Sequence, residues 1–362
     1  MRLLSILLSF SLLLPLTFSC QRKNQVMNER KPVTEELSGE VLHFDDVQVP
    51  SPVLLSSCGE LLLVKTTDNN AKIALCRVDG DSVKVQDRGV KKGRGPYEFI
   101  YANYCVGGDS LFVMDSNPMG FTALYGIPLK KAGALSDYTG WRRYIESDFP
   151  QMRTVGYFIR NSPGCFVACA GEPGNEQIFS LLDFNNSVVT PLAFWPDDGN
   201  ECETEVKQMV YMNSSIGPGP DGLFAYAADR GRYLAIMGID GNGIAVKNLI
   251  YDVLPKFTSQ NHNVRYDKAQ HAGIIVKCTD ERIYAKLYRD DFSESEDYKG
   301  YPSYCFDEIE IYDWDGRFIK CIRTDRPYST FCPSSDDRYL YTTSIDLETG
   351  GEMLLSYYVC IQ

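Results

Sequence analysis

The densest group of residues that could bind a charged ligand is the segment Gly93-Arg94-Gly95-Pro96-Tyr97-Glu98-Phe99. Closely spaced glycines can let a backbone wrap a phosphate, but this segment lacks both the Lys-Ser/Thr ending of a P-loop and the spacing of a dinucleotide-binding turn. We therefore expect a structural crossing in which Phe99 packs into the core. Arg94 and Glu98 then satisfy neighbouring groups or touch a ligand.

Two further residue classes could hold a metal ion. Asp79-Gly80-Asp81 and Asp313-Trp314-Asp315-Gly316 resemble the starts of calcium loops, but neither continues to the distal glutamate that such a loop needs. The chain has three histidines, and His262 lies in a polar stretch where we expect a solvated or hydrogen-bonded side chain that could touch a ligand. We predict no metal site, no cofactor and no catalytic residue, since nucleophile-elbow and zinc-protease motifs are absent from the sequence.

The longest polar insertion, Arg289 to Tyr304, mixes acidic residues with aromatic ones. Such a run is usually solvated, yet aromatic rings stack on sugars and on partner side chains, and loops carry many binding sites. A weaker case of the same kind starts at Trp195. The aromatic residues that we expect on a binding rim are Phe292, Tyr298, Tyr301, Tyr304 and Trp195.

A different chemistry, covalent lipidation, is indicated at Cys20. Arg2 is followed by an apolar run from Leu3 to Leu16, which is the layout of a secretory signal peptide. The end of that run, Leu16-Thr17-Phe18-Ser19-Cys20, resembles a bacterial lipobox, in which the cysteine is lipidated and becomes the new N-terminus. The alternative is an ordinary cleaved signal with an incidental cysteine. We expect a signal peptide at 1–19 and a mature protein held at a membrane by lipid.

Composition narrows the class of partner. The formal net charge is −12, which argues against nucleic acid, because neutralising phosphates needs concentrated Lys and Arg. The one short basic cluster in the folded part is Lys91-Lys92-Gly93-Arg94. Hydrophobic residues make up 44% of the chain and tyrosines outnumber phenylalanines, 23 to 18, as suits strands with one wet face. The chain is therefore expected to be globular and rich in strands.

The cysteines do not look like a disulfide framework. The chain has 12, and several stand among apolar residues, such as Cys76, Cys165, Cys169 and Cys321. In that setting cysteine behaves as a small buried apolar side chain. Lipidation of Cys20 would leave an odd number, so we expect mostly free thiols, with one or two disulfides possible.

From about Val41 the chain repeats one pattern, in which two strand-like runs are joined by a short turn of Asp, Asn or Gly. The clearest example is Glu308 to Asp313, a Trp-Asp-Gly turn, and Arg317 to Ile322. Asp-Gly between alternating apolar runs is a strong hairpin signal, because glycine accepts the positive φ of the primed turns. We count six such hairpins, with turns near positions 80, 116, 185, 241, 315 and 349.

Six hairpins, each completed by a shorter apolar run, predict an all-β, six-bladed β-propeller with four-stranded antiparallel blades. The only expected helix is about Glu203 to Met212. We expect Val41 to Val49 to add a strand to the last blade and so close the ring. Residues 20–40 then form a flexible lipidated tether, and 41–362 form the propeller.

The chain resembles the six-bladed β-propeller lipoproteins related to the TolB-like propellers of Gram-negative bacteria. Gly93 to Phe99 is similar to a Gly-x-Gly-Pro-x-Glu-Phe segment of that family, and Glu308 to Phe331 is the second matching passage. The resemblance covers essentially the whole mature chain. The resemblance implies an exported scaffold that binds a partner. It implies no reaction, because propellers with the same fold serve as enzymes, sugar binders and protein docks.

We therefore expect a monomeric, lipid-anchored binding module of the cell envelope whose partner is an envelope protein or a glycan. Arg22 and Lys23 follow Cys20 without an acidic run, which favours the periplasmic face of the outer membrane over the cell surface. The alternative function is a carbohydrate-active enzyme, a polysaccharide lyase or glycosidase, with carboxylates or tyrosines in the central funnel. A tight set of such groups with a shifted pKa would favour the enzyme.

Overall fold

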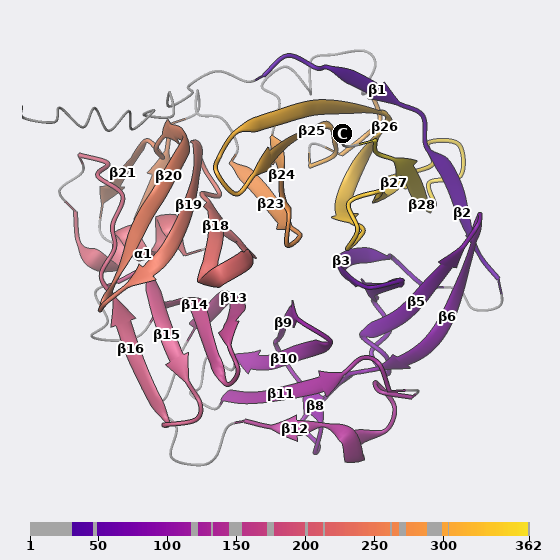
Figure 1. Cartoon of the computed structure of the whole chain (residues 1–362), viewed down its shortest axis with the longest axis horizontal. Coiled ribbons are helices and arrows are strands. Elements are labelled where there is room, and N and C mark those ends of the chain that lie inside the picture. Colours follow the sequence, from indigo (N-terminus) through magenta and orange to yellow (C-terminus); the bar gives the residue numbers. More distant parts are fainter. Residues whose placement is uncertain are drawn as a thin grey trace, which may run out of the picture.

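A computed structural model shows strands arranged radially around a common centre (Figure 1). It contains one α-helix, α1 (Thr204–Tyr211), within the residues described. The structure describes residues 31–45, 49–116, 122–131, 133–144, 154–171, 177–199, 202–212, 214–260, 263–267, 273–287, 299–302 and 304–360.

Three groups of four strands form separate antiparallel sheets. The first contains β9 (Ala102–Gly107), β10 (Ser110–Ser116), β11 (Thr122–Pro128) and β12 (Arg142–Arg143). The second contains β13 (Thr154–Ser162), β14 (Cys165–Gly171), β15 (Phe179–Asp183) and β16 (Val188–Leu192). The third contains β17 (Ser215–Pro218), β18 (Leu223–Ala227), β19 (Arg232–Asp240) and β20 (Gly243–Val253).

The remaining long strands form one continuous sheet of 12 strands. Along it lie β23 (Ile274–Cys278), β24 (Arg282–Leu287), β25 (Phe306–Asp313), β26 (Phe318–Pro333), β27 (Tyr339–Ile345), β28 (Glu352–Tyr358), β2 (Glu40–Phe44), β6 (Ser82–Gly89), β5 (Ile73–Asp79), β4 (Leu61–Lys65) and β3 (Val53–Cys58), with β1 (Glu35–Leu37) beside β26. Two small ladders, β7 (Lys91–Lys92) with β8 (Glu98–Phe99) and β21 (Phe257–Gln260) with β22 (Asn263–Tyr266), lie outside these sheets. This radial all-β arrangement is a β-propeller.

Two strands change partner along their length and hold the large sheet together. β26 pairs with β25 from Phe318 to Arg323 and again, across an irregularity, at Tyr328; from Tyr328 onward it pairs with β27. β2 pairs with β28 through Glu40–Leu42 and then, in parallel, with β6 through His43 and Phe44. The expected N-terminal strand therefore does lie beside the C-terminal strand, although it is shorter than 41–49. Pairing across the two chain ends removes an exposed edge from each.

All six predicted hairpins are confirmed by their strand pairing. Gly80 and Gly241 adopt φ of 64° and 58°, the left-handed conformation that a side chain disfavours. The apolar runs that we expected next to the hairpins are β4, β14, β18 and β24. Each is the second strand of its group, and it is more buried than the first strand, which lies inside it (Figure 1).

The alternation of antiparallel strands gives the molecule two faces. In each group of four strands, one turn joins the first strand to the second and another joins the third to the fourth. These turns, such as Gly59-Glu60 and Asp79-Gly80, lie at one end of the strands, which we call the turn face. The described parts of the other connections, including 90–101, 193–199, 202–212 and 299–302, lie at the opposite end, which we call the loop face. Across the middle, Lys277 of β23 donates a hydrogen bond to the Leu55 carbonyl of β3 (2.7 Å).

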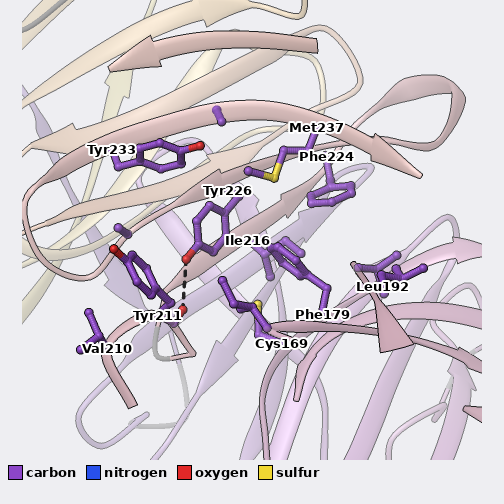
Figure 2. Packing of buried hydrophobic residues seen from close by; sticks show 14 of the residues in the cluster. Cys169, Phe179, Leu192, Val210, Tyr211, Ile216, Phe224, Tyr226, Tyr233 and Met237 are labelled. Atoms are coloured by element: carbon purple, nitrogen blue, oxygen red, sulfur yellow. Dashed lines mark hydrogen bonds between the residues drawn. The ribbon is translucent and has the colours of Figure 1, made fainter. Parts of the chain in front are cut away.

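The core is divided into clusters between neighbouring groups of strands. Figure 2 shows one of them, where Phe179, Phe224, Tyr226 and Met237 pack together. The Tyr226 hydroxyl donates to the Tyr211 carbonyl of α1 (3.1 Å), so the buried hydroxyl is satisfied. The helix, predicted at about Glu203 to Met212, is confirmed, and it covers the loop-face end of this cluster.

The eleven cysteines of the described residues all carry free thiols. Cys76, Cys169 and Cys321 are buried, as expected, whereas Cys165 is half-buried. Burial in apolar surroundings raises the pKa of the Cys76 thiol to about 12, so this group is an inert packing side chain.

The fold begins before Val41. β1 pairs in parallel with Ile322–Thr324 of β26, and Glu35 forms an ion pair with Lys320 (2.7 Å). Upstream of β1, the Lys31 backbone N–H donates to the Glu310 carboxylate (2.8 Å). Residues 31–40 were expected within a flexible tether. They pair instead, because the edge of β26 offers unsatisfied backbone groups that polar sequence can match. Cys20 and the predicted signal peptide, 1–19, lie outside the described residues.

Candidate functional site

A groove opens on the turn face between the group β3–β6 and the turn that joins β26 to β27. We call it the seam groove. Its volume is about 640 Å³. The residues that line it are Ser57, Gly59, Glu60, Leu61, Leu62, Arg77, Val78, Asp79, Ser334, Ser335, Asp336, Arg338, Tyr339 and Tyr341.

One wall of the seam groove is aromatic. Tyr339 and Tyr341 stand two residues apart on β27, so they project from the same face of the sheet. Their rings are nearly parallel, at 22° and 6.3 Å between centroids. Tyr358 lies opposite Tyr339 on β28 and packs edge-on against it at 5.7 Å. Tyr339 is 39% exposed and Tyr341 only 9%, so Tyr339 offers the free ring surface and Tyr341 supports it.

The turn between β26 and β27 supplies a fixed polar corner. The Ser334 hydroxyl donates to the Asp336 carboxylate (2.7 Å) and accepts from the Tyr339 N–H (2.9 Å). Arg338 donates its backbone N–H to the same carboxylate (3.2 Å) and forms an ion pair with it. These contacts hold the Asp336 and Arg338 side chains next to the ring of Tyr339.

The facing wall comes from β4 and β5 and carries both signs of charge. Arg77 pairs with Glu60 (3.4 Å), and Lys84 beside the groove pairs with Asp79 (3.0 Å). On the floor, the Ser57 hydroxyl donates to the Pro333 carbonyl (2.8 Å) and lies 3.2 Å from the Ser335 hydroxyl. Because the charges pair across short distances, the groove presents hydrogen-bonding groups with little net charge.

The ionisation states in the seam groove follow from these contacts. Hydrogen bonds from Ser334 and then Arg338 lower the pKa of Asp336, so it is a carboxylate and an acceptor. Burial, with smaller effects of Tyr339 and Asp336, raises the pKa of Tyr341 to about 12, so its hydroxyl stays protonated. The corner can therefore accept hydrogen bonds from hydroxyl groups beside an aromatic ring.

The described aromatic residues of the predicted rim lie on the loop face, opposite the seam groove. Tyr304 is 54% exposed, Tyr301 packs against Cys305 and Phe306, and Trp195 packs edge-on against Tyr211 of α1 at 6.4 Å. Phe292, Tyr298 and His262 lie outside the described residues. Within the described part of the rim, Tyr304 alone offers an exposed ring, so these aromatics form no common platform there.

The glycine-rich segment also lies on the loop face, where it closes on itself. The Glu98 carboxylate accepts a hydrogen bond from the Gly95 N–H (2.8 Å), and Phe99 is buried in the core. A Cβ at Gly93 would lie 2.0 Å from the Glu98 carboxylate oxygen, so a side chain at position 93 would displace the Glu98 carboxylate from this closure. Arg94 is exposed. The expectation that Glu98 satisfies neighbouring backbone and Phe99 packs inward agrees with these contacts.

A second group of polar side chains gathers on the loop face beside the inner strand β13. Tyr157 of β13 is 51% exposed, yet burial and then the negative charge of Asp229 raise its pKa. Burial also raises the pKa of Asp229, although the adjacent Arg230 opposes this shift. Arg230 lies over the ring of Tyr266, 5.3 Å from its centroid. Tyr157 and Asp229 are therefore two titrating groups close enough to affect each other, and burial raises the pKa of both.

Within the described residues no cluster of three or more potential metal ligands occurs. No helix in those residues is long and apolar enough to cross a membrane.

Sequence reasoning missed the seam groove because its walls come from positions near 60 and near 340. Two signals pointed toward it in retrospect, namely the Tyr-x-Tyr alternation at 339–341 and the Tyr357-Tyr358 pair near the chain end. Neither shows that the ends of the chain lie side by side.

No protein-family model matches the chain, and no curated protein matches it. Solved propellers are similar to it at low identity. The β-propeller domain of Myceliophteria thermophila Cps50 (Swd1) is 10% identical, with a TM-score of 0.43, covering 87% of this chain and 99% of that one. The RRP9 WD40 repeats are 8% identical (TM-score 0.41; 86% and 96% covered), and an oligogalacturonate lyase in complex with manganese is 10% identical (TM-score 0.37; 83% and 74% covered).

Proposed function

We propose that this protein is a lipid-anchored binding module of the cell envelope and that its ligand is a neutral saccharide held in the seam groove. The observation that carries the proposal is the exposed ring of Tyr339 beside the fixed Asp336–Arg338 corner. A sugar ring offers an apolar face to an aromatic side chain and hydroxyls to carboxylate and guanidinium groups. The paired charges of the groove favour a neutral ligand over a strongly charged one.

The scaffold of this module is a propeller of six blades. The partner changes in β26 and β2 divide the large sheet into three groups of four strands, β23–β26, β26–β28 with β2, and β3–β6. Three separate four-stranded sheets complete the ring. In this count β26 serves as the outer strand of one blade and the inner strand of the next.

The anchor is the lipid on Cys20. Ten residues, 21–30, separate it from the first described residue, Lys31. A chain of that length reaches at most about 35 Å when extended. The propeller is thereby held close to the membrane, which we propose to be the outer membrane at its periplasmic face, and it works as a monomer.

A glycan array probed with the purified full chain tests the ligand. We expect binding to neutral glycans and a loss of about two- to tenfold in affinity for Tyr339→Ala, because one stacked aromatic surface contributes about 0.5–1.5 kcal/mol beyond its buried area. Tyr304→Ala is the matched control, since it removes an exposed tyrosine from the other face. Equal losses in both variants, or retention by Tyr339→Ala, would exclude the groove.

A protein ligand is the other outcome of this test. Capture of a defined envelope protein that is lost in Tyr339→Ala and kept in Tyr304→Ala, without glycan binding, would replace the saccharide by a protein in the same groove.

The second candidate function is a carbohydrate-active enzyme, and one observation favours it. Tyr157, Asp229 and Arg230 gather on the loop face, and the pKa values of the tyrosine and the carboxyl are both raised. Titrating groups that lie close together and have shifted pKa values are typical of acid–base sites. Release of reducing ends or unsaturated products from a glycan panel, abolished in Asp229→Asn, would establish this activity. Its absence in the wild type across lyase and hydrolase substrates would exclude it.

A further inference from the structure

A second cavity, of about 300 Å³, opens on the loop face between β4–β5 and β9. Four lysines line it, and we call it the lysine pocket. Its lining residues are Lys65, Lys72, Val90, Lys91, Lys92, Phe99, Ile100, Tyr101, Ala102, Asn103 and Tyr104. The short basic cluster of the sequence, Lys91-Lys92, supplies only half of these cations. The fold brings Lys65 and Lys72 to the same cavity.

Backbone hydrogen bonds hold the lysine-bearing segments together. Lys65 ends β4 opposite Ile73, which begins β5, so Lys72 lies at the same end of the ladder. The Lys72 N–H donates to the Val90 carbonyl (2.9 Å), and the Lys92 N–H donates to the Asn69 carbonyl (2.8 Å). The four side chains therefore start from a frame that strand pairing fixes.

The segment that follows the lysines is anchored by aromatic packing. Tyr97 stacks on Tyr138 at 5.1 Å with an interplanar angle of 3°, and Trp141 packs edge-on against both rings. The Trp141 indole N–H donates to the Ala134 carbonyl (2.8 Å). This packing holds the wall of the lysine pocket in place before any ligand arrives.

The contacts that the structure gives these lysine side chains are to neutral groups. Lys72 Nζ donates to the Thr67 carbonyl (3.1 Å), and Lys65 Nζ lies 6.0 Å from the centroid of the Tyr104 ring. Two carboxylates lie close to these segments, and both accept hydrogen bonds from backbone N–H groups. Asp115 accepts from Ile100 and Tyr101 (3.2 and 2.9 Å), and Glu98, which lies opposite Lys91 in the β7–β8 ladder, accepts from Gly95 (2.8 Å). Four cations thus converge on one cavity in a chain whose net charge is −12.

We propose that the lysine pocket binds an oxyanion, either a carboxylate, a sulfate or a phosphate, carried by a ligand about the size of one sugar residue. Ammonium groups are compact charges with rotatable donors, so they neutralise an oxyanion without demanding one planar geometry. Tyr101, 57% exposed at the rim, offers a ring to the body of the ligand. The cations surround one small cavity and do not follow a stripe, which suits a small acidic group better than a long polyanion.

The lysine pocket is independent of the seam groove, because it lies on the opposite face and carries a different charge. Its ligand is separate from the neutral saccharide proposed above, and either site can fail without the other.

Titration calorimetry of the full chain with glucuronate and with inorganic phosphate tests the proposal, with glucose as the neutral control. We expect at least one anion to bind, glucose not to bind in this pocket, and the affinity to fall as salt is raised from 20 to 300 mM, about twofold or more. In Lys91→Gln/Lys92→Gln the dissociation constant should rise about tenfold, since two exposed charges are removed. Lys91→Arg/Lys92→Arg should keep binding.

The matched control is Lys247→Gln/Lys256→Gln, which removes two exposed lysines elsewhere and changes the net charge equally. It should leave the anion affinity within twofold. Binding of glucuronate alone identifies a carboxylated sugar as the ligand class, and binding of phosphate alone identifies a phosphorylated one. The proposal is overturned if neither anion binds, if both lysine double variants weaken binding equally, or if Lys91→Gln/Lys92→Gln binds as the wild type does.

Discussion

Glu310 is the side chain whose replacement tests the energetics of the fold most directly. It is 2% exposed and accepts three hydrogen bonds: from the Tyr251 hydroxyl (2.6 Å), from the Tyr312 hydroxyl, and from the backbone N–H of Lys31 (2.8 Å). Tyr251 belongs to β20, and Lys31 lies at the start of the described chain. One carboxylate therefore ties a neighbouring blade and the N-terminal segment to β25.

Glu310→Gln keeps the shape of the side chain and removes its charge. The Lys31 N–H can only donate, so the amide oxygen must face it, and the amide nitrogen then faces the two tyrosine hydroxyls, which rotate to accept. Three charge-assisted hydrogen bonds become neutral ones, each weaker by about 1 kcal/mol. We expect a loss of about 3 kcal/mol in the free energy of unfolding. With an unfolding entropy of about 2 cal/mol/K per residue, a loss of about 3 kcal/mol lowers the Tm of a fold of about 330 residues by about 4 °C.

Urea unfolding followed by tryptophan fluorescence measures this loss, with Tyr251→Phe and the double variant completing a cycle. Tyr251→Phe should cost about 1.5–3 kcal/mol, and the double variant should lose clearly less than the sum, because Glu310→Gln weakens the same hydrogen bond that Tyr251→Phe removes. Tyr339→Phe, at an exposed ring, should stay within about 0.5 kcal/mol of the wild type. The reasoning would be refuted if Glu310→Gln were as stable as the wild type or more stable, since relief of the carboxylate's desolvation would then outweigh its hydrogen bonds.

Two further predictions concern a buried lysine and the lipid anchor. Burial lowers the pKa of Lys286 to about 7. Between pH 7 and about 10, the unfolded chain therefore binds a proton that the folded chain does not. The free energy of unfolding should rise with pH across that window. Lys286→Met, which fills the same buried site, should flatten that rise in unfolding measurements from pH 6.5 to 9.5. If the free energy of unfolding kept the same slope against pH in the variant, Lys286 would have to stay protonated beside the Tyr304 and Ser329 carbonyls. Cys20→Ala should abolish incorporation of labelled fatty acid and leave the protein soluble or unprocessed. Unchanged labelling would refute the lipobox, and Cys360→Ala, at an exposed thiol, is the control.

The hairpins could be predicted because their signals are local. A turn such as Asp79-Gly80-Asp81 lies within a few residues of both strands that it joins, and alternation along each strand shows which face is buried. The same holds for α1, whose amphipathic run is continuous in sequence. The pairing of Glu35–Leu37 with β26 could not be foreseen, since a short segment of three paired residues carries no periodicity and its partner lies almost 290 positions away.

The binding sites were predicted less well than the fold. The exposed loops with aromatic residues drew attention to Tyr301, Tyr304 and Trp195, but exposure and orientation depend on neighbours that composition does not reveal. Trp195 packs against α1, for example, and Tyr301 against Phe306. For the glycine-rich segment, the expectations that Phe99 packs into the core and that Glu98 satisfies neighbouring backbone are confirmed, because Glu98 lies only three residues from Gly95 and local contacts suffice.

The sequence by itself determined that the chain is all-β, where its hairpins turn, and that Cys20 is the candidate for lipidation, since each of these follows from residues near one another in the chain. The tertiary structure alone decided which surfaces can bind. Closing the ring brings Arg77 and Glu60 across from Tyr339, and strand pairing brings Lys65 and Lys72 beside Lys91 and Lys92. Both sites depend on side chains whose proximity is created by long-range backbone hydrogen bonds, and those pairings leave no pattern within any short stretch of sequence.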